Sequence, residues 1–204
     1  MIKRMFRLLV AIGLLVSLST ATHGGEGESG EAVAVFAGGC FWCMEPPFDA
    51  VDGVQSTTSG YTGGHLKNPT YEQVTGEDTG HYEAVRIVYD PDRVSYEELL
   101  YVLWRNIDPL DAGGQFCDRG DSYRAAIFYR NDEERVLAEE SRDAVAEQLG
   151  DEVVTEILPA DTFYDAEDYH QNYYQENPLR YRFYRSRCGR DSRLEELWGA
   201  EAGG

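Results

Sequence analysis

Residues 33–45 read VAVFAGGCFWCME, and this stretch decides how the chain folds around its most reactive side chain. The apolar run Val33 to Ala37 predicts a strand, Gly38-Gly39 predicts a tight turn, and the breaker-free stretch up to Pro46 predicts the start of a helix. A thiol at a helix N-terminus meets unpaired backbone N–H groups and the positive end of the helix dipole, and both favour the thiolate. The pattern therefore predicts that Cys40 is a nucleophile between a strand and a helix.

Strands and helices alternate along the rest of the chain, without an internal repeat. Ser95 and Glu98 form a capping box, and Asn131 and Gly150 bracket a second helical stretch. We expect strands at 54–61, 83–89, 123–129 and 153–158, and helices at 95–106, 131–150 and 165–174. This order predicts one α/β domain, an α+β two-layer sandwich with a mixed sheet and flanking helices arranged as a ferredoxin-like plait.

Both ends of the chain are expected to lie outside this domain, which we place at residues 33–189. Residues 1–21 have basic side chains ahead of an apolar run from Leu8 to Leu18, which is the layout of a secretory signal peptide and shorter than the ~20 residues of a membrane span. We therefore expect export, to the periplasm. We expect residues 22–32, which are Gly-rich and polar, to be a flexible lead-in. After Pro178 we expect a long coil tail with the basic, aromatic sequence LRYRFYRSRCGR, followed by a C-terminal extension at 190–204.

Composition limits the classes of function. The 204 residues include 18 Lys plus Arg and 37 Asp plus Glu, and the resulting net charge of -19 argues against binding to nucleic acid. A chain of this length can bury a core without a disulfide or a structural metal, so its four cysteines are free for chemistry. His65, His81 and His170 do not stand at the spacing of a zinc site, and we expect no metal. A zinc module built from the four cysteines is a non-catalytic alternative.

Cys43 completes a C-x-x-C with Cys40, a spacing typical of thiol-disulfide exchange. The chief enzymatic alternative is therefore a thioredoxin-like oxidoreductase that uses these two thiols. Phe41 and Trp42 lie between them and could form an apolar wall, although core packing is the commoner role of such residues. That alternative leaves the polar groups described next without a role.

Glu83 is an acid on an apolar strand face. In EAVRIVY a period of two places Glu83 on the same face as Val85 and Ile87. Burial there would raise its pKa and make it a general acid, whereas a position at the strand end would let it reach water; the residues leave both open. Tyr123 likewise begins the strand expected at 123–129, on the face of Ala125, and a buried phenol needs a hydrogen-bond partner such as a substrate oxygen.

Six segments of the chain resemble one known family. They are GCFWCME (39–45), SGYTGG (59–64), NPTYEQV (68–74), TGHYEAVRIVYDP (79–91), the Asp118-x-Gly120-x-x-Tyr123-Arg124 stretch and FYDAEDYHQNYY (163–174). Their order and spacing are similar to those of the A-type peptide methionine sulfoxide reductases, from about Val33 to Gly189. The resemblance implies reduction of the S epimer of methionine sulfoxide, in peptides and as the free amino acid, without a prosthetic cofactor.

The resemblance also implies a role for individual residues. Cys40 would attack the sulfoxide sulfur, Glu83 would protonate the sulfoxide oxygen, and Tyr71 and Tyr123 would bind that oxygen. A sulfoxide oxygen leaves readily only once it is protonated, so a thiol on one side and donors on the other suit this reaction. Three further residues would hold the substrate: Phe41 and Trp42 would enclose its methyl group, and Asp118 would bind its backbone.

Methionine then leaves and Cys40 remains as a sulfenic acid, which a second thiol converts into a disulfide. The resemblance favours Cys188 in the tail as this resolving thiol. The commonest family pattern has no cysteine at the positions of Cys117 and Cys43, so these two extra thiols are alternatives. The disulfide would be recycled by a thioredoxin-like reductant, in the cell envelope if the protein is exported. Oxidised proteins and peptides are the expected partners, and the protein is expected to be a monomer.

Overall fold

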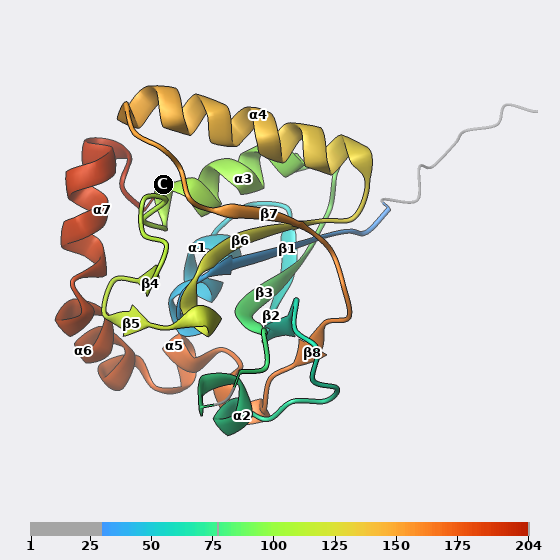
Figure 1. Ribbon diagram of the computed structural model, residues 1–204, viewed down its shortest axis with the longest axis vertical. Helices are drawn as coiled ribbons and strands as arrows, with labels where there is room; N and C mark the ends of the chain where they lie inside the picture. The colour runs from blue at the N-terminus through green and yellow to red at the C-terminus, as the bar shows by residue number, and fades with distance from the viewer. Residues whose placement is uncertain (1–29, 77, 204) are drawn as a thin grey trace, which may run out of the picture.

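The computed structural model describes residues 30–76 and 78–203. Six strands form one sheet in the order β7-β6-β1-β3-β2-β8 (Figure 1). Their bounds are β1 Ala32–Gly38, β2 Val54–Thr62, β3 Tyr82–Tyr89, β6 Ala125–Tyr129, β7 Glu156–Pro159 and β8 Tyr164–Asp165. Two short strands, β4 (Gly114–Gln115) and β5 (Asp118–Arg119), pair separately. The expected signal peptide at 1–21 lies outside the described residues, as does most of the lead-in at 22–32.

The central four strands have the predicted ferredoxin-like arrangement. β1 lies between β3 and β6 and is antiparallel to both, and β2 is antiparallel to β3. Helices α1 (Glu45–Asp49) and α3 (Tyr96–Arg105) occupy the two crossover connections of this split β-α-β pattern. β7 adds a parallel neighbour to β6, so the sheet is mixed, as expected.

The two helices with the clearest sequence signals form where predicted. Ser95 accepts a hydrogen bond from the Glu98 N–H while the Glu98 side chain accepts one from Ser95, which completes the capping box of α3. α4 (Asp132–Leu149) begins at Asn131 and ends at Gly150, whose left-handed conformation suits glycine. These two helices lie side by side along the sheet (Figure 1). None of the described helices is both long and apolar enough for a membrane span.

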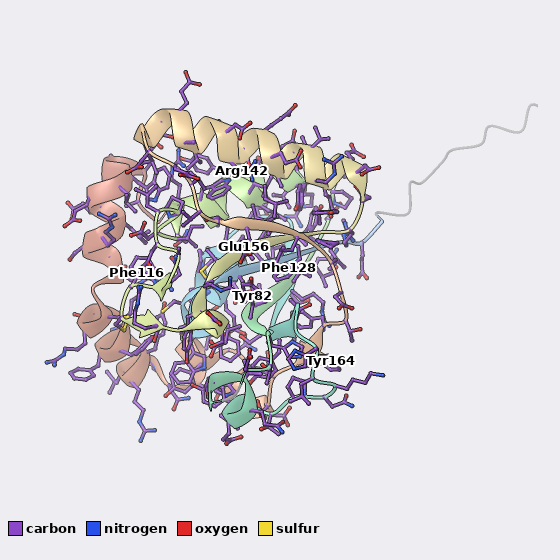
Figure 2. The ribbon with its side chains drawn as sticks, in the orientation of Figure 1. Tyr82, Phe116, Phe128, Arg142, Glu156 and Tyr164 are labelled. Atoms are coloured by element: carbon purple, nitrogen blue, oxygen red, sulfur yellow. A yellow bond between two sulfur atoms is a disulfide. The ribbon has the colours of Figure 1, made fainter. Side chains whose placement is uncertain are left out.

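Apolar side chains cover both faces of the sheet. Phe36 and Ile87 belong to the larger core, which extends to Leu99 and Leu103 of α3. On the opposite face a smaller cluster surrounds Tyr82 and Phe128, whose rings meet edge to face at 5.5 Å. Figure 2 shows these two side chains near Glu156, which accepts a hydrogen bond from the Tyr82 hydroxyl. β1 is therefore buried on both faces, which accounts for its unbroken apolar sequence.

Three expected elements differ from the structure. Tyr123 ends a 3-10 turn, η2 (Asp121–Tyr123), and β6 begins only at Ala125. The strand expected at 153–158 is β7, displaced towards its C-terminus because the Val154 N–H bonds to Pro109 instead of joining the sheet. The single helix expected at 165–174 is instead three short pieces, β8, η3 (Asp168–His170) and α5 (Tyr173–Glu176). Asn172 separates the last two because its positive φ of 50° cannot continue a helix.

The expected coil tail is also wrong, because the segment after Asn177 folds into helices. α6 (Pro178–Cys188) starts with a proline, which suits a first helical turn, and Gly189 then separates it from α7 (Arg190–Trp198). A short 3-10 turn, η4 (Gly199–Glu201), follows. Leu194 and Trp198 are one helical turn apart, and both are buried in the larger core. The segment that we expected as an extension thus contributes to the packed core.

Candidate active site

Cys40 lies where β1 ends. Gly39 has a φ of 79°, and a Cβ added there would lie 2.5 Å from Gln115, so this turn requires glycine. The helix that we expected directly after the turn is a single 3-10 turn, η1 (Phe41–Cys43), in which the Cys43 N–H donates to the Cys40 carbonyl at 2.9 Å. The α-helix α1 begins later, with proline in its first turn. Cys40 therefore does not face the end of a long helix dipole.

Glu83 reaches the same turn from β3. Its Oε2 accepts a hydrogen bond from the Phe41 N–H at 3.1 Å, and its side chain shares the core face of Val85 and Ile87. Of the two alternatives that the sequence left open, the structure has the buried one, since Glu83 is only 1% exposed. Burial raises the pKa of Glu83 to about 8, so the carboxyl group is protonated at neutral pH.

Two tyrosines complete a cluster of hydroxyl groups beside Glu83. The Tyr123 hydroxyl hydrogen-bonds with both Glu83 and Tyr71. Tyr71 is the first residue of α2 (Tyr71–Gly76), and its N–H donates to Glu167 Oε1 at 2.9 Å. Glu167 also accepts a hydrogen bond from Tyr61 of β2 at 2.9 Å. It therefore joins α2 to the sheet, a role that the sequence analysis did not predict, although Glu167 lies in the family-like segment 163–174.

The two thiols of the C-x-x-C are both buried and hydrogen-bonded to each other. Burial raises the pKa of Cys40 above its usual value, contrary to the expectation of a thiolate stabilised by a helix. The pKa of Cys43 is lowered to about 6, first by the hydrogen bond with Cys40 and then, against its burial, by the charges of Arg190 and Arg185. In this state the negative charge is thus favoured on Cys43.

Arg190 is a buried cation that the sequence did not single out. It is 1% exposed, and its guanidinium donates to Gly38 O at 3.0 Å and to Asn106 O at 2.7 Å. It also lies 4.3 Å from the centre of the Phe116 ring. These contacts join α7 to the end of β1, next to the turn that bears Cys40.

The two expected aromatic residues both contact His170 but differ in burial. Phe41 is 1% exposed and packs against Tyr61 and His170, at ring distances of 6.0 and 5.0 Å. Trp42 is half-buried, donates from Nε1 to His170 Nδ1 at 3.0 Å, and stacks on Tyr173 at 3.7 Å. His170 thus orients Trp42, and Tyr173 covers one face of its ring.

α6 closes the site from the C-terminal side. The Tyr184 hydroxyl donates a hydrogen bond to Asp118 Oδ2 and lies next to the Cys40 thiol. The Tyr184 ring meets the edge of Trp42 at 5.8 Å. As a result only 6% of Cys40 is exposed. The sequence analysis predicted neither Tyr184 nor Tyr173 as a site residue. Tyr173 lies in the family-like segment 163–174, whereas the only signal for Tyr184 was the high aromatic content of its segment.

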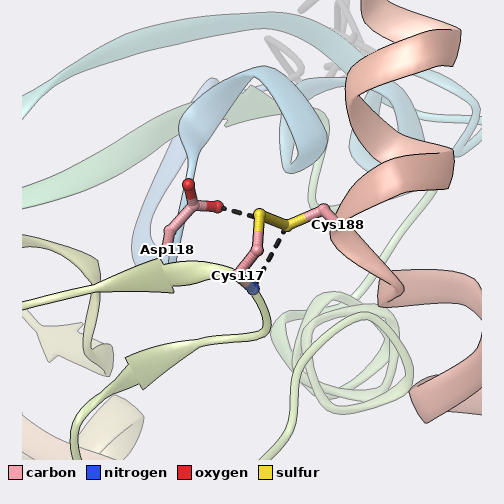
Figure 3. A group of neighbouring side chains, drawn as sticks. All are labelled: Cys117, Asp118 and Cys188. Carbon is pink, nitrogen blue, oxygen red and sulfur yellow. Dashed lines mark hydrogen bonds between the residues drawn. A yellow bond between two sulfur atoms is a disulfide. The ribbon is translucent and has the colours of Figure 1, made fainter.

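The structure pairs Cys188 with Cys117, and not with Cys40 (Figure 3). The Cα atoms of the two disulfide partners are 4.9 Å apart, because α6 ends against the start of β5. The Cys117 N–H donates to Cys188 Sγ at 3.2 Å, and the same sulfur lies 3.7 Å from Asp118 Oδ2. Cys40 and Cys43 remain free thiols. The site therefore contains an inner thiol pair, Cys40 and Cys43, and an outer disulfide.

Free thiols beside a protonated carboxyl group, on a ferredoxin-like plait, define a thiol-dependent oxidoreductase. Residues 32–202 match the family described as peptide methionine sulfoxide reductase. The chain belongs to this family, in its MsrA branch. It is a peptide-methionine (S)-S-oxide reductase, which draws electrons from thiols and uses no prosthetic cofactor.

Individual relatives match over nearly the whole domain. The chain is 56% identical to MsrA of Bacillus subtilis strain 168 over 171 residues, which are 83% of this chain and 97% of the relative. It is 52% identical to MsrA 2 of Caulobacter vibrioides over 196 residues, 96% of this chain and all of the relative. The solved MsrA of Corynebacterium diphtheriae superposes with a TM-score of 0.71 at 34% identity, covering 75% of this chain and 78% of that one.

Proposed function

We propose that Cys40 reduces methionine S-sulfoxide with Glu83 as the acid and with Tyr71 and Tyr123 as the groups that bind the sulfoxide oxygen. The observation that carries this assignment is the buried Glu83, which bonds to the turn of Cys40 and has a pKa of about 8. Its proton is available at neutral pH, within the same cluster as the two phenols. Such an arrangement stabilises charge on an oxygen while a sulfur atom is attacked from the other side.

The first step transfers one oxygen atom from the substrate to the enzyme. The Cys40 sulfur attacks the sulfoxide sulfur, while Glu83 gives its proton to the sulfoxide oxygen and so weakens the sulfur–oxygen bond. The oxygen ends on Cys40 as a sulfenic acid, and methionine leaves. Glu83 is protonated again by the proton that the Cys40 thiol gave up when it attacked. Methionine is reduced and Cys40 is oxidised by the same two electrons.

Substrate binding is expected to displace Tyr184. We propose that Trp42 and Phe41 enclose the substrate methyl group and that Asp118 accepts a hydrogen bond from the substrate backbone. Asp118 already accepts one from the Tyr184 hydroxyl, so the tyrosine occupies the position that a substrate N–H would take. A substrate N–H would therefore compete with the Tyr184 hydroxyl for Asp118.

A relay through three cysteines accounts for the disulfide. We propose that Cys188 attacks the Cys40 sulfenic acid, which forms a Cys40–Cys188 bond and releases water, and that the Cys117 thiolate then attacks Cys188. Cys40 is released as a thiol, and the remaining Cys117–Cys188 bond is the one in Figure 3. Cys188 is one helical turn from Tyr184, whose hydroxyl lies next to Cys40, and this proximity supports the transfer.

Cys43 is the second candidate for the resolving thiol, because it is a free thiol next to Cys40 and its lowered pKa makes it a thiolate. A single turnover of the fully reduced protein, with its disulfides mapped by mass spectrometry, distinguishes the two. The relay predicts a Cys117–Cys188 bond in the unmodified protein, a trapped Cys40–Cys188 bond in Cys117→Ser, and an unchanged result in Cys43→Ser. A Cys40–Cys43 bond in Cys117→Ser would overturn the relay, and methionine formation in Cys40→Ser would overturn the nucleophile.

We also propose that the protein acts in the periplasm as a monomer on oxidised proteins and peptides, recycled there by a thioredoxin-like reductant. The basic residues and apolar run in residues 1–21 support export. Cell fractionation and N-terminal sequencing of the mature protein test this assignment. A protein that retains residues 1–21 in the cytosol would contradict it.

A further inference from the structure

α6 has two chemically different faces. Tyr181, Tyr184 and Cys188 are at least half-buried and point towards the site. On the other side Leu179 is 80% exposed and Phe183 is 67% exposed, more than any other large hydrophobic side chain of the described residues. These two are one helical turn apart and therefore form a continuous apolar ridge. Single exposed apolar residues are common on proteins, whereas two adjacent ones on the helix that carries Cys188 are a candidate binding surface.

The same side of α6 is positively charged. Arg180, Arg182 and Arg187 are exposed, and none of them has a carboxylate within 4.0 Å among residues 30–76 and 78–203. Arg187 lies over the ring of Phe183, 5.8 Å from its centre. The chain as a whole has a net charge of -19, so this positive area stands out against an acidic protein. We call the set Leu179, Arg180, Arg182, Phe183 and Arg187 the outer face of α6.

The disulfide lies at the C-terminal end of α6, and Cys188 points towards the site. Cys188 is the last residue of α6, and its partner Cys117 is exposed to solvent while Cys188 is half-buried. The hydrogen bond from the Cys117 N–H to Cys188 Sγ would stabilise Cys188 as a departing thiolate. A thiolate from outside therefore meets its accessible target at Cys117 and its better leaving group at Cys188.

We propose that the outer face of α6 is the docking surface for an acidic thioredoxin-like reductase, which attacks Cys117. The inference rests on the proposed function, because that function requires an external dithiol. The apolar ridge fits the uncharged surface around a reductase thiol, and the arginines select an acidic partner that the rest of this protein repels. The first reductase thiolate forms a mixed disulfide with Cys117 and releases the Cys188 thiolate. The second reductase thiol then releases Cys117 and leaves as the reductase disulfide, so two electrons enter the enzyme.

The test compares the rates at which two reductants reduce the Cys117–Cys188 disulfide of the oxidised protein. The first is a reduced bacterial thioredoxin of net negative charge, and the second is dithiothreitol, which needs no docking surface. We expect Arg182→Glu with Arg187→Glu to lower the second-order rate constant with thioredoxin by about tenfold at low ionic strength, and salt to reduce this difference. Phe183→Ala should lower the same constant at every salt concentration. The rates with dithiothreitol should remain unchanged.

Arg142→Glu is the matched control, because Arg142 is a partly exposed arginine of α4, remote from α6 (Figure 2). It should leave both rates unchanged. Equal rates for all variants with thioredoxin would overturn the proposal, as would an equal loss with dithiothreitol. A thioredoxin lacking its second thiol should be trapped on Cys117, and trapping on Cys188 would refute the order of attack. Methionine release by each reduced variant in a single turnover involves no reductant, so a failure of the proposed function would appear there separately.

Discussion

The Tyr184 hydroxyl donates a hydrogen bond to Asp118 and lies next to Cys40, so a single side chain of α6 stands between the thiol and the outer disulfide. Cys188, one turn further along α6, is bonded to Cys117, the residue before Asp118. We therefore expect closure of the site to be coupled to oxidation of the outer cysteines, because the disulfide fixes the end of the helix that carries Tyr184. This relationship makes the redox state of the outer pair measurable at Cys40.

Cys40 should react slowly with alkylating agents while the outer disulfide is intact. Only 6% of Cys40 is exposed in the closed state, whereas a released α6 would uncover it. We expect iodoacetamide to modify Cys40 at least about tenfold faster in the Cys117→Ser, Cys188→Ser double variant than in the oxidised protein. Peptide mass spectrometry measures both rates. Equal rates would show that α6 does not protect the thiol.

Glu83→Gln should abolish most of the activity and remove the decline of the rate at alkaline pH. The protonated form of Glu83 is the proposed acid, and with a pKa of about 8 it is lost as the pH rises above that value. We expect the single-turnover rate of the unmodified protein to fall above pH 8, and that of the variant to be about 100-fold lower without this decline. Glu45→Gln neutralises another buried carboxyl group and should retain most of the rate. A full rate in Glu83→Gln would remove Glu83 from the mechanism.

Above pH 4.5, Glu83→Gln should also be more stable than the unmodified protein, and the difference should grow as the pH rises to 8. The pKa of Glu83 is about 8 in the folded protein and 4.5 in its reference state, so the folded protein binds a proton more tightly between these values. The stability that the protonated Glu83 side chain contributes is fully present below pH 4.5 and is lost as the pH rises through 8. Glu83→Gln has no such loss, and near pH 7 we expect it to be more stable by on the order of 3 kcal/mol. Urea unfolding at pH 4.5 and pH 8 measures the difference, which a pH-independent result would contradict.

Trp42 should report the opening of the site. Its indole stacks on Tyr173 at 3.7 Å and meets Tyr184 edge-on, and both tyrosines lie in the segment that the disulfide holds down. Reduction of Cys117–Cys188 should change the tryptophan fluorescence, and Trp42→Phe should eliminate this change. Trp104→Phe is the control, because Trp104 is buried in the larger core and bonds to Ser141. If the change persists in Trp42→Phe, Trp42 does not respond to α6.

Leu194→Ala tests whether α7 is part of the domain. Leu194 is 1% exposed, and its truncation leaves a cavity in the larger core. We expect the free energy of unfolding to fall by about 2–5 kcal/mol. Glu195→Ala, at the exposed neighbouring position, should change it by no more than about 0.5 kcal/mol. Equal effects in chemical denaturation would mean that residues 190–204 lie outside the cooperative unit.

Some parts of the site could be predicted because they depend on nearby residues. The turn at Gly39 follows from glycine's access to positive φ, and the caps of α3 and α4 follow from side chains three residues from the groups they bind. Strand periodicity likewise placed Glu83 on the face of Val85 and Ile87. It left open whether that end of the strand is covered, because the cover comes from the turn at Phe41, 42 residues away in the sequence.

The sequence by itself thus determined the central plait and the strand, turn and thiol order around Cys40. Only the tertiary structure decided that α7 completes the core, that Tyr184 closes the site, and that Cys188 bonds to Cys117. The last two contacts join residues 66 and 71 positions apart. Local patterns cannot select such partners, because the packing of α6 against β5 sets which thiol comes within bonding distance.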